Sequence, residues 1–85
     1  MNRIGVVGIV IEDTESVSTV NEILHNHSHI IVGRMGVPYK NKNINVISII
    51  VDGTTDDIGS LTGKLGTVSG ITVKSALTKK IFHDN

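Results

Sequence analysis

Residues 3–11 read Arg-Ile-Gly-Val-Val-Gly-Ile-Val-Ile, and this stretch decides the fold. Its β-branched residues favour an extended strand, and its apolar side chains occupy both of the alternating faces. A strand that is apolar on both faces is typical of the centre of a sheet. Residues 44–51, Ile-Asn-Val-Ile-Ser-Ile-Ile-Val, have the same character. We therefore predict two central strands at these positions.

The segments that follow these strands have the pattern of helices. Asp13 and Thr14 offer N-cap side chains, and apolar residues then recur at helical spacing. That face consists of Val17, Val20, Ile23 and Leu24. Thr54 and Asp57 resemble a capping box ahead of a second helix. The second face consists of Ile58, Leu61 and Leu65.

Two further strands complete the expected order β-α-β-β-α-β. They are predicted at residues 29–37 and 70–77, and a hairpin loop that contains Pro38 precedes the strand at residue 44. This order is typical of the α+β, ferredoxin-like plait, a four-stranded antiparallel sheet with two helices on one face. We predict one domain over residues 1–78 and a polar C-terminal tail over residues 79–85.

This architecture leaves one face of the sheet without helices. Because both central strands are apolar on both faces, that face would expose a patch of several hundred Å², which soluble monomers avoid. We therefore predict a homo-oligomer, a dimer or a tetramer, that buries the helix-free face. The interface residues we assign to it are Val7, Ile9, Ile47 and Ile49.

Composition excludes several classes of function. Eight Lys and Arg residues balance eight Asp and Glu residues in the 85-residue chain, whereas nucleic-acid-binding domains usually carry a basic excess. Cysteine is absent, which excludes disulfides and thiolate metal sites and favours the cytoplasm. No apolar run reaches the roughly 18–20 residues of a membrane span. We expect no direct nucleic-acid partner and no membrane partner.

A cluster of three histidines is one candidate site. His25, His27 and His29 would line one side of an extended segment and could share a metal ion such as zinc or nickel. Alternatively, they form the polar end of the first helix, where histidine interacts favourably with the negative pole of the helix dipole. The sequence identifies no cofactor.

A second candidate site binds a small ligand. It combines the turn after the first strand, Glu12, Asp13 and Thr14, with the stretch Arg34, Met35 and Gly36. Paired glycines in an edge strand mark a bulge or a close approach to a ligand or subunit. Arg34 could bind a carboxylate or phosphate, or form a surface ion pair with Glu12 or Asp52. No Ser, His and acidic residues have a spacing that predicts catalysis, so we expect no enzyme.

Several stretches resemble the iron-only hydrogenase system regulators. They are Val32-Gly33-Arg34-Met35-Gly36-Val37-Pro38-Tyr39, Val51-Asp52-Gly53-Thr54-Thr55-Asp56, Leu61-Thr62-Gly63-Lys64-Leu65-Gly66, Val73-Lys74-Ser75-Ala76 and the stretch 3–10. The resemblance implies an oligomeric ACT-like domain with a regulatory role, which we take to be transcriptional. The fold is also similar to the C-terminal domain of the nickel-responsive repressors. The strand-two His-x-His of those repressors falls near Gly36, Val37 and Pro38 here, so their nickel site is not expected.

Our hypothesis for the function is a cytoplasmic regulatory domain that senses a small ligand at a site between subunits. Two alternatives remain open. One is a metal sensor that uses His25, His27 and His29. The other is an adaptor that binds a protein partner and no small molecule.

Overall fold

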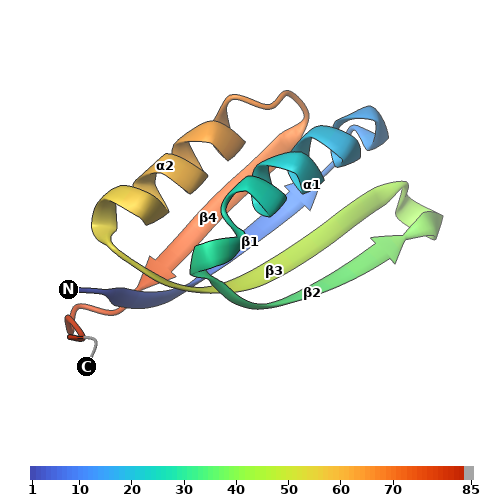
Figure 1. The fold of residues 1–85 in the computed structure, drawn as a ribbon. Coiled ribbons are helices and arrows are strands. Elements are labelled where there is room, and N and C mark those ends of the chain that lie inside the picture. Colours follow the sequence, from blue (N-terminus) through green and yellow to red (C-terminus); the bar gives the residue numbers. More distant parts are fainter. Residues whose placement is uncertain (84–85) are drawn as a thin grey trace.

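The computed structural model describes residues 1–83, which form one sheet and two α-helices in the predicted order (Figure 1). The elements are β1 (Arg3–Ile11), α1 (Val17–Asn26), β2 (Ile31–Tyr39), β3 (Ile44–Gly53), α2 (Thr55–Gly66) and β4 (Ile71–Leu77). Short 3₁₀ turns, η1 (Thr14–Ser16), η2 (Ser28–Ile30) and η3 (Lys40–Lys42), join some of them. The helices within residues 1–83 are too short or too polar to cross a membrane.

The sheet has the order β2-β3-β1-β4, and every neighbouring pair is antiparallel. The prediction that β1 and β3 are central and β2 and β4 are edges is therefore confirmed. Figure 1 shows both helices on the same side of the sheet. The chain has the predicted α+β, ferredoxin-like architecture.

The predicted capping residues cap η1 and α2, whereas Ser16, the N-cap of α1, makes no side-chain cap bond. The Asp13 carboxylate accepts a hydrogen bond from the backbone N–H of Glu15 at 3.0 Å, so it caps η1, the 3₁₀ turn that leads into α1. The Thr54 hydroxyl accepts one from the N–H of Asp57 at 3.0 Å and caps α2. Each satisfies a backbone donor that has no partner inside its helix.

The second strand differs from its predicted bounds. It begins at Ile31 because η2 occupies the preceding residues, and it continues through Pro38 to Tyr39. Proline interrupts a central strand because it has no N–H for the ladder, but an edge strand has one free side. Pro38 lies on such an edge, opposite Asn45. A register shift between Ile31 and Gly33 confirms the predicted irregularity near the first glycine of β2.

The core lies between the sheet and the helices, and it corrects one part of the sequence analysis. Val7, Ile9 and Ile49 are fully buried there, and Ile47 is 5% exposed. These four side chains point toward the helices, so they cannot form an interface between subunits. Because β1 and β3 are apolar on both faces, the alternation alone did not show which face the helices cover.

The opposite, helix-free side is called the open face below. Residues directly opposite each other in a ladder share a face, so the register places Val6, Ile50 and Ala76 together on it. Val6 is 47% exposed and Ile50 46% exposed. Met35, Val37 and Tyr39 of β2 extend the same face, and all three are exposed. The open face is thus apolar, as predicted, but it consists of the alternate residues.

The C-terminal segment continues beyond β4 and returns to the N-terminus. The N–H of Thr78 donates to the Ile4 carbonyl at 2.9 Å. Asn2 and Phe82 then exchange two backbone hydrogen bonds of 2.6 Å. Part of the predicted tail is therefore attached to the sheet, while residues 84 and 85 lie outside the described residues.

Candidate functional site

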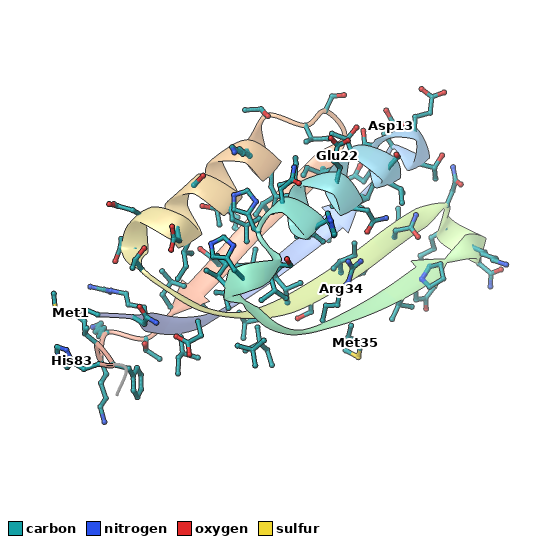
Figure 2. The ribbon with its side chains drawn as sticks, viewed as in Figure 1. Met1, Asp13, Glu22, Arg34, Met35 and His83 are labelled. Carbon is teal, nitrogen blue, oxygen red and sulfur yellow. The ribbon has the colours of Figure 1, made fainter. Side chains whose placement is uncertain are left out.

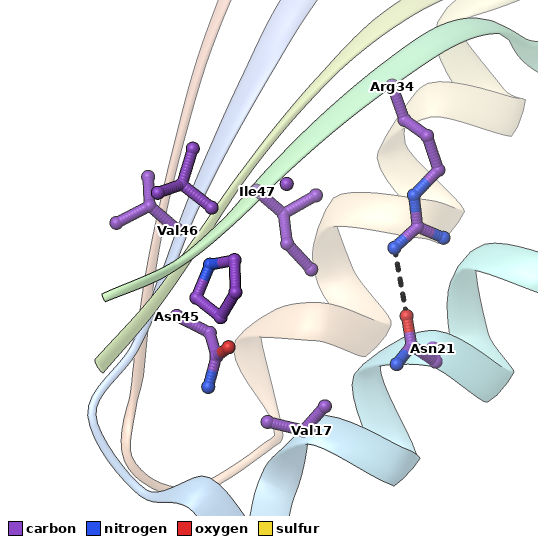
Figure 3. Close-up of a pocket in the computed structure, with 9 residues that line it drawn as sticks. Val17, Asn21, Arg34, Asn45, Val46 and Ile47 are labelled. Atoms are coloured by element: carbon purple, nitrogen blue, oxygen red, sulfur yellow. Dashed lines mark hydrogen bonds between the residues drawn. The ribbon is translucent and has the colours of Figure 1, made fainter. Parts of the chain in front are cut away.

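A shallow groove runs between α1 and β2, where the edge of the sheet extends beyond the helix. We call it the α1–β2 groove. Its central hollow has a volume of about 220 Å³ (Figure 3). Its walls include Val17, Asn21, Arg34, Gly36, Asn45 and Ile47. Among the hollows that adjoin it, one shares Asn21 and Arg34 with it and another shares Pro38 and Asn45.

Arg34 is the one charged residue that lines the central hollow. It pairs with Ile49, a core residue, and its side chain therefore lies on the helix side of β2. Its Nη2 donates a hydrogen bond of 2.9 Å to the Asn21 Oδ1 of α1, across the groove (Figure 3). The predicted alternatives, Glu12 and Asp52, are not the partners in this bond. Because a guanidinium has five N–H donors, this bond leaves most of them for other acceptors.

The lining of the groove suits a small anion with an apolar part. The Arg34 guanidinium matches the geometry of a carboxylate or a phosphate. The side-chain amides of Asn21 and Asn45 add donors and acceptors, and Val17 and Ile47 add apolar surface. A volume of about 220 Å³ is below the roughly 300–1,000 Å³ of sites for drug-sized ligands. The central hollow alone therefore suits only a small molecule.

Four of the six predicted ligand residues lie in three different places. Arg34 and Gly36 line the central hollow, and Thr14 lines the adjoining one, next to Tyr39 and Asn43. Figure 2 shows Met35 on the opposite side of the sheet from Arg34, which follows from the alternation along β2. Met35 therefore belongs to the open face and not to the groove.

Glu12 and Asp13 have a structural role beside the loop before β4. Their backbone N–H groups both donate to the Gly70 carbonyl, at 2.7 Å and 3.3 Å. The Asp13 side chain also caps η1. Neither residue lines the hollows described above.

Sequence reasoning missed Asn21 and Asn45, which the fold brings to the same hollow from α1 and β3. An asparagine on an exposed helix position carries no signal by itself. The signal that could have indicated them was Arg34, because a charged residue at a helix-facing position of an edge strand requires polar neighbours.

The three histidines do not converge. His25 and His29 are exposed, whereas His27 is buried between the helices. The Nδ1 of His27 lies 2.8 Å from the Ile23 carbonyl, and its Nε2 lies 3.5 Å from the Ser60 Oγ. A carbonyl only accepts, so Nδ1 carries the proton and donates. Within residues 1–83, no three His, Asp or Glu side chains are placed to hold a metal ion.

His27→Ala is expected to lower the free energy of unfolding by about 1–3 kcal/mol, because the Ile23 carbonyl loses its partner and a buried ring is removed. Urea unfolding would measure this change. His25→Ala and His29→Ala are the controls, and each should stay within about 0.5 kcal/mol of wild type because both side chains are exposed. Equal effects of all three substitutions would contradict this structural role.

Known proteins resemble the chain in sequence and in fold. The model of the family described as "Iron-only hydrogenase system regulator, putative" matches residues 3–75. The uncharacterized protein TM1266 from Thermotoga maritima is 36% identical, with a TM-score of 0.87 over 93% of this chain and 100% of that chain. No curated protein matches the chain.

More distant solved structures share the fold. The ACT domain of GTP pyrophosphokinase from Chlorobium tepidum is 19% identical, with a TM-score of 0.76 over 89% of this chain and all of that one. A nitrogen regulatory PII-like protein from Thiomonas intermedia K12 is 16% identical, with a TM-score of 0.51 over 92% of each chain. At these identities the likeness concerns the fold alone, which is ACT-like.

Proposed function

Because the chain belongs to the family of iron-only hydrogenase system regulators, we propose that it is a non-enzymatic regulatory domain that oligomerises through its sheet and binds a small anionic ligand. The observation that carries this proposal is the double use of β2. Arg34 and Gly36 of this strand line the α1–β2 groove, whereas Met35, which lies between them in the sequence, belongs to the open face. A ligand in the groove and a second subunit on the open face would contact the same strand.

The position of β2 supports a coupling between the two surfaces. It is an edge strand that contains two glycines and a register shift, so it has fewer constraints than β1 or β3. A ligand that binds one position of β2 more tightly would favour the oligomer that contains that position. Occupancy of the groove would then control assembly.

The relatives give separate support. The family is described as regulatory. The PII-like protein of the same fold was solved with ADP, AMP and bicarbonate bound, so this architecture accommodates anionic ligands elsewhere. The absence of cysteine favours a reducing compartment, and we place the domain in the cytoplasm. A transcriptional role would require a partner that reads DNA, because the chain has a net charge of zero.

Native mass spectrometry of the untagged protein tests this proposal, and we expect a dimer or a tetramer that retains a small molecule. Val6→Glu should convert it to monomers, because the substitution places a charge at the centre of the open face. Thr19→Glu on the exposed side of α1 adds the same charge away from the sheet and should not change the number of subunits in the oligomer. A monomeric wild-type protein would contradict the assembly, and a bare oligomer would favour the adaptor hypothesis.

A further inference from the structure

Within the four strands of the described residues, two charges of opposite sign lie on the open face. In the strands, Arg3 and Arg34 belong to the helix side, whereas Lys74 and Asp52 belong to the open face. Lys74 lies opposite Gly8, and Asp52 lies opposite Ile4. The rest of this face consists of apolar side chains, two glycines and a few small polar residues. These two charges are therefore the features that would select one arrangement of a partner from many.

One carboxylate oxygen of Asp52 has no hydrogen-bond donor among the described residues. This oxygen, Oδ1, is shielded from solvent. A buried acceptor without a partner costs free energy, and the cost is larger for a charged group. Asp52 as a whole is only partly buried, so a cation from outside the subunit would meet the accessible part of the carboxylate and offset the cost of its charge.

Lys74 of the same subunit is too far away to be that cation. The two residues are separated by two strand spacings, about 10 Å, and by four residues along the strands, about 13 Å. The combined distance of roughly 16 Å exceeds the reach of an ion pair. A second copy of the chain, however, offers a lysine on a face of the same shape.

We infer that two copies stack through their open faces about a two-fold axis that passes over Val6, with Lys74 of each copy against Asp52 of the other; this inference rests on the proposed oligomerisation. Every contact in such an interface occurs twice. Such an axis lies in the plane of the interface. It brings Lys74 of one copy to Asp52 of the other if it crosses the line that joins Lys74 and Asp52 within one subunit, at the midpoint and at a right angle. That midpoint lies at Val6, which pairs with both Ile50 and Ala76.

The composition around this axis fits the anatomy of an interface. Apolar residues occupy its centre, where Val6 and Ile50 are each nearly half exposed in the single subunit, and the charges lie at the two sides. Gly8 has no side chain beside Lys74, so the lysine stem has room to lie on the sheet. The net charge of zero means that two copies do not repel each other.

Charge reversal tests the pairing. Sedimentation velocity should show that Lys74→Glu and Asp52→Lys each weaken self-association by about tenfold or more, because each places like charges together twice. The double variant Lys74→Glu/Asp52→Lys should recover an affinity near that of wild type. Lys64→Glu on α2 is the matched control, since it makes the same change of charge at an exposed helix position. If Asp52→Lys does not fold, Asp52→Asn replaces it and should weaken association less.

Cross-linking tests the axis independently, because the chain contains no cysteine. Val6→Cys should give covalent dimers with a short bis-maleimide, whereas Thr19→Cys on α1 should not. An associating wild-type protein whose single charge variants associate equally well would overturn the inferred pairing and leave the proposed oligomer intact. A monomeric wild-type protein would overturn both.

Discussion

Gly70→Ala is expected to lower the free energy of unfolding by about 2–5 kcal/mol, a large part of the stability of a domain of this size. Gly70 has φ +75°, a conformation that costs an L residue about 1–2 kcal/mol. A Cβ at this position would also overlap with the Cβ of Asp13. Such overpacking typically costs about 1–3 kcal/mol. The two costs add because the first arises from the backbone conformation of residue 70 and the second from the contact of its Cβ with Asp13.

The consequence is large because Gly70 connects two parts of the chain. Its carbonyl accepts hydrogen bonds from the N–H groups of Glu12 and Asp13, and the neighbouring Ser69 carbonyl accepts one from the Ser16 hydroxyl at 2.8 Å. A displaced Gly70 would therefore disturb the turn between β1 and α1 together with the start of β4.

Urea unfolding of matched variants would measure the effect. Gly59→Ala is the control, because Gly59 lies in α2 and, outside the backbone of that helix, no atom lies within 4 Å of the place its Cβ would take. It should stabilise the domain by up to about 1 kcal/mol, since alanine favours a helix more than glycine does. Gly70→Asn should fall between wild type and Gly70→Ala, because asparagine tolerates positive φ but retains the overlap. If Gly70→Ala were as stable as wild type, this result would contradict the close approach of Asp13 to position 70.

Local signals in the sequence predicted the elements well. β1 was predicted with its observed bounds, because a short run of β-branched residues ends at acidic residues that begin a helix. The caps at Asp13 and Thr54 were predicted because each bond joins residues two or three apart. Such contacts depend on the neighbouring chain and not on the rest of the fold.

The identity of the buried face could not be predicted in the same way. β1 and β3 are apolar on both faces, and the difference between the faces depends on the register between strands. Thr72 and Lys74 show which side of β4 faces solvent, since they alternate with apolar residues. Only the pairing of Lys74 with Gly8 transfers this information to β1 and places Val6 on the open face.

The candidate site was predicted in part for a related reason. Arg34 was identified because a guanidinium is chemically distinctive in a short, weakly charged chain. Asn21 and Asn45 were not, because they meet only when α1 lies along the edge of the sheet. His25, His27 and His29 were grouped because they are close in sequence, but a helix end followed by a 3₁₀ turn directs them to different environments.

Arg34→Gln is expected to weaken the binding of a small anion in the α1–β2 groove by about 10-fold to 100-fold. The substitution removes the guanidinium, and a hydrogen bond to a charged group contributes roughly 1.5–3 kcal/mol, which corresponds to about this loss of affinity. Asn21 should remain in place, because its amide can bond to glutamine as it does to Arg34. Arg34→Lys keeps the charge without the planar fork, so its effect should be smaller.

Titration with inorganic phosphate and, separately, with acetate would measure this loss by ¹H–¹⁵N NMR. In the wild-type protein, the signals of the Arg34 Nε and the Asn21 side-chain amide should shift together, because the two groups are hydrogen-bonded across the hollow. Lys64→Gln removes one positive charge from α2 and should bind like wild type. Equal losses in Lys64→Gln and Arg34→Gln would indicate general charge attraction, and the groove would then not be the site. A loss confined to Arg34→Gln would place the anion between α1 and β2, on the strand whose other side belongs to the open face.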